Sequence, residues 1–232
     1  MITPLASVLV NRLSGSRTII TRKMQTPPSL TYDQKLKIDD LAARLIESEE
    51  PVTLLVDGHE AELSEYIIKK LPAAKVVMDG GSLRASNIKL AAWTDYFVVS
   101  EHFARDYMGY RALETEAEIK AALIELNKIC RGDAFITLGE KGCAFLKSGM
   151  LQIVPAWLCN VVDTTGAGDV FHGAFTYGVH YSWHIDNIIL FASLTAAISI
   201  EKKGVRESMP DLAIVHNSLN NYERNLTQYF GE

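Results

Sequence analysis

The sequence is poor in cysteine, carries no excess of positive charge and contains no long apolar run. Its three cysteines, Cys130, Cys143 and Cys159, lack CxxC spacing and paired His ligands, which argues against both a disulfide framework and a zinc site. We expect them to be small apolar side chains in a reducing, cytoplasmic compartment. A net charge of −5 offers no basic stripe for nucleic acid, and no apolar run approaches the ~20 residues that span a bilayer. The composition therefore predicts a soluble protein with neither a nucleic-acid nor a membrane partner.

The 232 residues alternate instead between strand-like and helix-like segments. Capping boxes at Thr31 and Thr115 open two predicted helices, and the apolar run from Val52 to Val56 is typical of a strand covered on both faces. Further strands are predicted at 75–78, 96–99, 134–137, 143–146 and 151–154, the last two as an antiparallel pair. Further helices are predicted at 61–70, 116–129, 167–181, 185–201 and from 210 onward. The alternation predicts an α/β fold in which a mostly parallel sheet lies between helices and ligands gather at the carboxyl ends of the strands.

The helix after Thr31 carries apolar residues that we expect to form its buried face. They are Leu36, Leu41, Leu45 and Ile46.

The first residues contain four basic side chains and no acid before Asp33, as transit peptides do. Two β-rich segments, 6–11 and 16–20, flank Leu13-Ser14-Gly15 and favour a hairpin instead. We therefore divide the chain into a β hairpin, 1–25, and an α/β core, 26–232.

One segment, 163–174, reads Asp-Thr-Thr-Gly-Ala-Gly-Asp-Val-Phe-His-Gly-Ala. Gly166 and Gly168 precede a helical pattern, so main-chain amides at a helix N-terminus could approach an anion such as a phosphate. Asp169 in the first turn could then take a proton from an attacking hydroxyl. The same residues are equally compatible with a tight turn in which Asp163 and Asp169 merely begin a helix. Walker A and dinucleotide patterns are both excluded, because no Gly-Lys-Ser/Thr occurs and Phe171 replaces the third glycine.

This segment resembles the signature of the PfkB/ribokinase family of small-molecule kinases. Thr137-Leu138-Gly139-Glu140-Lys141-Gly142 is similar to the family's strand and turn before the signature, and 196–204 resembles the helix and loop that close its nucleotide pocket. Residues 14–19 resemble the lid strand of the ketohexokinase-like branch. The resemblance implies a three-layer α/β/α kinase with a β lid at 1–25. It would use ATP and Mg²⁺ to phosphorylate a hydroxyl of a ketohexose, a ribose or a related sugar, as a homodimer paired through its lid strands.

The resemblance also assigns roles to residues. Asp169 would be the catalytic base, and the amides of Gly166, Ala167 and Gly168 would form the anion hole. The nucleotide candidates are Thr137, Gly139, Gly142, Ser100, Thr164 and His172. The substrate candidates are Arg17, Asp79 and Asp169 itself.

Two departures from the family's pattern stand out. Ser100 and Phe103 occupy the Asn and Glu positions of the family's N-x-x-E element, which leaves Glu101 as the candidate metal ligand. The chain also opens at the lid, without the family's first strand–helix units, so we expect an unpaired sheet edge and exposed apolar helix faces. Either Met1 is not the natural start or the chain is a shortened product. Two alternatives therefore stay open: a nucleoside kinase of the same family, and a non-catalytic nucleotide-binding protein.

Overall fold

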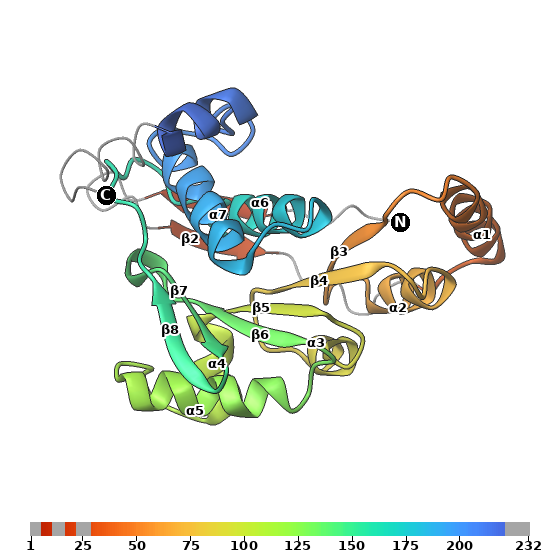
Figure 1. The fold of residues 1–232 in the computed structure, drawn as a ribbon, viewed down its shortest axis with the longest axis horizontal. Coiled ribbons are helices and arrows are strands. Elements are labelled where there is room, and N and C mark those ends of the chain that lie inside the picture. The colour runs from red at the N-terminus through yellow and green to blue at the C-terminus, as the bar shows by residue number, and fades with distance from the viewer. Residues whose placement is uncertain (1–5, 11–16, 22–28, 221–232) are drawn as a thin grey trace.

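The computed structural model describes residues 6–10, 17–21 and 29–220, and its elements alternate along the chain much as the sequence predicts (Figure 1). The strands are β1 (Ala6–Val10), β2 (Arg17–Thr21), β3 (Thr53–Asp57), β4 (Lys75–Gly80), β5 (Tyr96–Ser100), β6 (Asp133–Thr137), β7 (Cys143–Lys147) and β8 (Met150–Val154). The helices are α1 (Tyr32–Glu47), α2 (Ala61–Lys70), α3 (Ala85–Ala91), α4 (Glu101–Met108), α5 (Glu116–Asn127), α6 (Ala167–His180) and α7 (Ile185–Ser199), with a short 3₁₀ turn at Gly139–Lys141. Residues 212–220 are also helical.

The main sheet has six strands in the order β3-β4-β5-β6-β7-β8. Strands β3 to β6 run parallel, whereas β7 and β8 are antiparallel additions at one side. The mostly parallel sheet and the antiparallel pair confirm the predicted topology. The connections between the parallel strands run through α2, α3, and the pair α4 and α5, as parallel pairing requires.

The core lies in two layers because side chains alternate along each strand. Val76, Met78 and Val99 face one apolar cluster, and their neighbours Val77 and Val98 face the other. Helices α3, α4 and α5 cover the first face, and α6 and α7 cover the second (Figure 1). Phe97 and Phe175, which belong to opposite layers, are both fully buried. The molecule is therefore a three-layer α/β/α structure.

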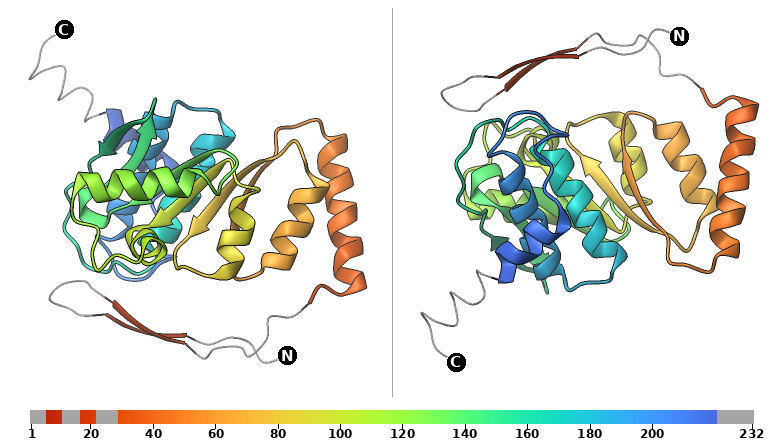
Figure 2. Two further views of the ribbon diagram at one scale, coloured as in Figure 1. Left: turned by 90° about the horizontal axis from the view of Figure 1, so that it is seen from below. Right: turned by 90° about the horizontal axis from the view of Figure 1, so that it is seen from above.

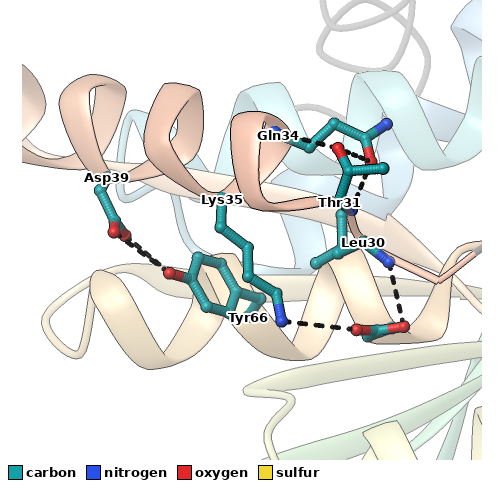
Figure 3. Close-up of polar contacts among 7 residues, drawn as sticks. Leu30, Thr31, Gln34, Lys35, Asp39 and Tyr66 are labelled. Carbon is teal, nitrogen blue, oxygen red and sulfur yellow. Dashed lines mark hydrogen bonds and ion pairs between the residues drawn. The ribbon is translucent and has the colours of Figure 1, made fainter.

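Helix α1 lies outside the sheet and docks on α2. The Tyr66 hydroxyl donates to both carboxylate oxygens of Asp39, at 3.0 and 3.2 Å, and the Leu30 amide donates to Glu62 Oε2 at 3.2 Å (Figure 3). The predicted capping box is present, since the Thr31 amide donates to Gln34 Oε1 at 2.9 Å.

The predicted apolar face of α1 is right for Leu45, which is partly buried against the cluster of Ala42, Leu71 and Ala74, and wrong for its other three residues. Leu36, Leu41 and Ile46 are exposed, and Ile38 and Ala42 are the buried side chains. Among the described residues, the core cluster at α1 joins it to α2 and the segments next to α2 and β3, so a narrow stripe of the helix is covered and the rest of the predicted face stays exposed.

Strands β1 and β2 pair antiparallel, with Val8 opposite Ile19, and form a sheet of their own (Figure 2). This confirms a hairpin where the sequence predicts one. The loop around Leu13-Ser14-Gly15 lies outside the described residues.

Strand β3 is an edge strand of the main sheet. Leu55 on β3 is 44% exposed and Leu63 on the adjoining α2 is 38% exposed. These positions fit the expected open edge and exposed helix face. Within the described ranges, every helix is too short or too polar to cross a membrane.

Candidate active site

Four parallel strands end at one edge of the sheet and bring polar residues together there. Asp57 and Asp79 are register partners at the ends of β3 and β4, and Ser100 and Thr137 are register partners at the ends of β5 and β6. Parallel strands share their carboxyl ends, so these four positions lie at one edge of the sheet, with Ser100 and Thr137 two residues beyond the level of Asp57 and Asp79.

Helix α6 begins at this edge, after Gly166. Gly166 has φ of 76°, and a Cβ there would lie 2.5 Å from Val205 Cγ1, so both its backbone angle and its surroundings favour glycine. The Ala167 amide lies 3.3 Å from the Thr164 carbonyl oxygen. For the amides of Gly168 and Asp169, the described part of the chain supplies no backbone acceptor outside the helix. These first-turn amides and the helix dipole suit an anion.

Asp163 joins the two loops behind this helix start. Its Oδ1 accepts from the Thr165 amide at 2.9 Å, and its Oδ2 accepts from the Gly204 amide at 3.3 Å. The amides of Val162 and Asp163 also donate to the carbonyl of Ile200, at 2.8 and 3.1 Å. The segment before α6 is thus bound to the segment after α7.

A cavity of about 480 Å³ opens at the same place. Its polar wall includes Asp79 from β4 and both Asp169 and His172 from α6. Its other wall comes from β3 and α2, namely Leu54, Leu55, Val56, Asp57, Glu60, Leu63, Ser64 and Ile67. The structure therefore brings three of the residues predicted from sequence into one cavity, with the exposed Asp169 at the helix start.

The carboxyl group of Asp79 is electrostatically perturbed. Burial raises its pKa, the nearby His172 opposes that rise, and the carboxylates of Asp169 and Asp57 add to it. The Asp79 carboxyl is thus partly withdrawn from solvent, in a cavity whose other acids disfavour its charged form.

His172 is a buried side chain, with 3% of its surface exposed. Its Nδ1 lies 2.7 Å from the Gly168 carbonyl oxygen and 3.4 Å from Asp79 Oδ2. Its Nε2 lies 3.1 Å from the Val98 carbonyl oxygen. Both ring nitrogens are therefore in contact with protein oxygens.

The other nucleotide candidates lie along the ends of β5 and β6. The Thr137 hydroxyl donates to the Val99 carbonyl at 3.3 Å. The turn after β6 contains Gly139 and Gly142, both with positive φ, and the Leu138 amide donates to the Gly142 carbonyl at 2.7 Å. Thr164 is partly buried beside the helix start.

Ser100 ends β5 and is the N-cap of α4. Its hydroxyl donates to the Gly81 carbonyl at 2.9 Å and accepts from the Phe103 amide at 3.0 Å, so it caps α4. Glu101 follows in the first turn of α4 and is partly buried. Among the residues that the structure describes, no three His, Cys, Asp or Glu side chains gather as a metal site would require. The side chain of Arg17 lies outside the described part.

The cavity wall at α2 was not predicted from the sequence. Glu60, Leu63, Ser64 and Ile67 follow the i, i+3, i+4, i+7 spacing of one helix face. That spacing could have been found in the sequence, but nothing in it says that this face borders a cavity.

Fold and site together define an α/β protein in which a helix start with amides suited to an anion lies beside an acidic cavity. Comparison with known proteins identifies the family. Residues 72–212 match the model of the pfkB family carbohydrate kinases. The chain belongs to this family.

Several relatives carry the name ribokinase. The ribokinase of Lactococcus lactis subsp. lactis (strain IL1403) is 31% identical over 199 residues, which are 86% of this chain and 61% of that protein. The structure of ribokinase from Giardia lamblia matches with a TM-score of 0.75 at 23% identity, over 95% of this chain and 72% of that one. The structure of Arabidopsis thaliana ribokinase complexed with ribose and ATP matches with a TM-score of 0.70 at 23% identity, over 92% and 68% respectively. At these identities the two structures show a ribokinase-like fold.

The chain spans about three fifths of the length of its Lactococcus relative.

Proposed function

We propose that this chain is a sugar kinase that transfers the γ-phosphoryl group of ATP to a hydroxyl of a ribose-like sugar. The observation that carries the proposal is the position of Asp169. It lies in the first turn of α6, beside amides without an acceptor in the described backbone, and it lines the cavity. A base and an anion site side by side are what phosphoryl transfer to an alcohol needs.

In the proposed reaction, Asp169 takes the proton of the acceptor hydroxyl as that oxygen attacks the γ-phosphorus. The bond between the γ-phosphorus and the bridging oxygen breaks, ADP leaves, and the proton remains on Asp169. The amides of Gly166, Ala167 and Gly168 are the proposed anion site for the transferring group, although the Ala167 amide also lies 3.3 Å from the Thr164 carbonyl oxygen. Aligned main-chain dipoles can stabilise that charge without reorganising during the step.

The nucleotide would lie along the row of Thr137, Gly139 and Gly142, with Ser100 and Thr164 beside it. Mg²⁺ prefers oxygen ligands and keeps phosphates and water around it, so it does not need the metal-binding cluster that the described residues lack. Glu101 is the proposed ligand. The metal would neutralise phosphate charge on the bound nucleotide.

The relatives favour ribose over a ketohexose among the acceptors that the sequence leaves open. The relatives described above are ribokinases, and a deoxyribokinase of Salmonella typhi is 32% identical over 131 residues. We therefore propose ribose or deoxyribose as the acceptor. Asp79 and Arg17 remain candidates for contact with its hydroxyls.

The test is an ADP-release assay of the 232-residue chain with ribose, deoxyribose, fructose and adenosine. Replacing Asp169 with Asn should lower kcat by about 10²- to 10⁴-fold, the range for a general base, while ATP affinity measured by calorimetry is retained. Asp33→Asn is the matched control, because Asp33 is also an acid in the first turn of a helix and lies far along the chain on α1. It should leave kcat unchanged.

Other outcomes identify the alternatives. Turnover of adenosine but of no sugar would indicate a nucleoside kinase. ATP binding without turnover of any acceptor would indicate a non-catalytic nucleotide-binding protein. Full activity of Asp169→Asn would remove the proposed mechanism.

A further inference from the structure

His172 joins three parts of the site through one ring. Its Nδ1 reaches the Gly168 carbonyl in the first turn of its own helix, and its Nε2 reaches the Val98 carbonyl on β5. Asp79, the register partner of Val98 on β4, places Oδ2 3.4 Å from Nδ1. The ring therefore bridges the start of α6 and the ends of two neighbouring strands.

Each form of the ring can be compared with these contacts. Carbonyl oxygens only accept hydrogen bonds, so each ring nitrogen needs a proton to bond its partner. A neutral ring with its proton on Nδ1 would leave a bare Nε2 3.1 Å from the Val98 oxygen. A neutral ring with its proton on Nε2 would leave a bare Nδ1 2.7 Å from the Gly168 oxygen and near a carboxylate. Only the imidazolium avoids a repulsive contact at both nitrogens.

A buried cation needs a partner, because its hydration is lost. Asp79 is that partner. The other acids that line this cavity are Asp57 from β3, Asp169 from α6 and Glu60 at the start of α2, and the first two act electrostatically on Asp79. The cavity side of His172 is thus lined by negative groups, which also favour the charged ring.

We propose that His172 is held as an imidazolium by Asp79 and that this buried pair positions the start of α6, and with it Asp169, against the strand ends. The catalytic consequence of the pair rests on the proposed function. The pair itself does not, because its charge state can be measured without turnover. His172 is a positioning residue here, since its ring contacts protein oxygens.

The first test is ¹⁵N NMR of the intact chain labelled at its six histidines, at pH 7. The His172 signals are assigned as those missing in His172→Asn. Both ring nitrogens of His172 should carry protons. A ring with one bare nitrogen would overturn the proposal.

Asp79→Asn tests the pairing and does not depend on the stability of the His172 variant. Removing the carboxylate should convert the His172 ring to a neutral form at pH 7. Asp57→Asn is the matched control, because it removes a carboxylate from the same cavity without touching the ring, and His172 should stay charged. A ring that remains an imidazolium in Asp79→Asn would overturn the role of Asp79.

The kinetic test separates positioning from packing. His172→Asn should lower kcat by about 10- to 100-fold, as small misplacements of catalytic groups do, with little change in KM for ATP. An unchanged kcat would assign His172 to packing alone and overturn the positioning role. An inactive wild-type chain with a charged His172 would count against the proposed function only, whereas an active chain with a neutral ring would count against the pair only.

Discussion

Gly142 shows at the scale of one residue how the turn after β6 depends on a missing side chain. Its φ is 102°, and a Cβ there would lie 2.0 Å from the Val154 carbonyl oxygen. Gly142→Ala should therefore lower the free energy of unfolding by more than the ~2 kcal/mol that a left-handed backbone alone costs. Urea titration followed by circular dichroism measures this change.

Gly149→Ala is the matched control for that substitution. Gly149 also has positive φ, 76°, but no atom lies within 4 Å of the added Cβ. Its cost should stay near the ~1–2 kcal/mol of backbone strain. Equal losses for the two variants would show that the contact with Val154 is relieved at little cost.

The residues of segment 163–174 could be predicted as site residues, because an acid and two glycines at a helix start already indicate their chemical roles. Asp169 could be placed in the first turn of α6, and Gly166 at a turn before it. The contacts of His172 could not be predicted, because Val98 and Asp79 approach it only through the sheet register. For the three cysteines, composition alone predicts small apolar side chains outside any disulfide. All three are free, and burial raises the pKa of Cys143 to about 12.

At the scale of an element, α5 depends on the capping box at its start. Glu118 Oε2 accepts from the Thr115 amide and from its hydroxyl, both at 2.9 Å, and these bonds lower the pKa of Glu118 below 4.5. Thr115→Ala should lower the free energy of unfolding by ~1 kcal/mol.

The capping box also makes the free energy of unfolding depend on pH. Because the pKa of Glu118 is lower in the folded state, its stabilising effect is present above pH 4.5 and is lost as the pH falls through the folded value. The difference in unfolding free energy between wild type and Glu118→Gln should therefore be largest at neutral pH and shrink in acid. Glu116→Gln, in the same turn but outside the box, is the control and should show a smaller change. A difference that grows in acid would contradict the assignment.

Local signals predicted most elements closely. Capping boxes and apolar runs found the starts of α1 and α5 and the strands β3 to β8 to within a residue or two at most ends. Most of the face of α1 was missed because that face depends on what packs against the helix. Ala42 is buried against Leu71 and Ala74, which follow α2, and no local pattern says where α2 will lie.

For the whole molecule, we predict a homodimer. The β1–β2 hairpin forms its own two-stranded sheet, so each strand has an outer edge that no strand among the described residues pairs. Such edges favour pairing with another chain. Sedimentation equilibrium at micromolar concentration should give twice the 25.7 kDa of the chain.

A chain beginning at residue 29 is the control for this prediction. It lacks both hairpin strands and should sediment as a monomer. A monomeric full chain, or a dimer that survives the deletion, would contradict pairing through the hairpin.

The order of the strands was only partly accessible from sequence. Alternation of segments predicts a parallel sheet, and the short connection between 143–146 and 151–154 predicts the antiparallel pair. The cavity could not be predicted, because its two walls come from β3 with α2 and from α6, which meet only in the assembled layers.

The double role of Asp163 has a thermodynamic consequence. Because one carboxylate fastens both the segment before α6 and the segment after α7, these parts of the chain do not have to be ordered separately when a ligand arrives. A site that is assembled in advance loses less conformational entropy on association, so more of the interaction energy is available as affinity.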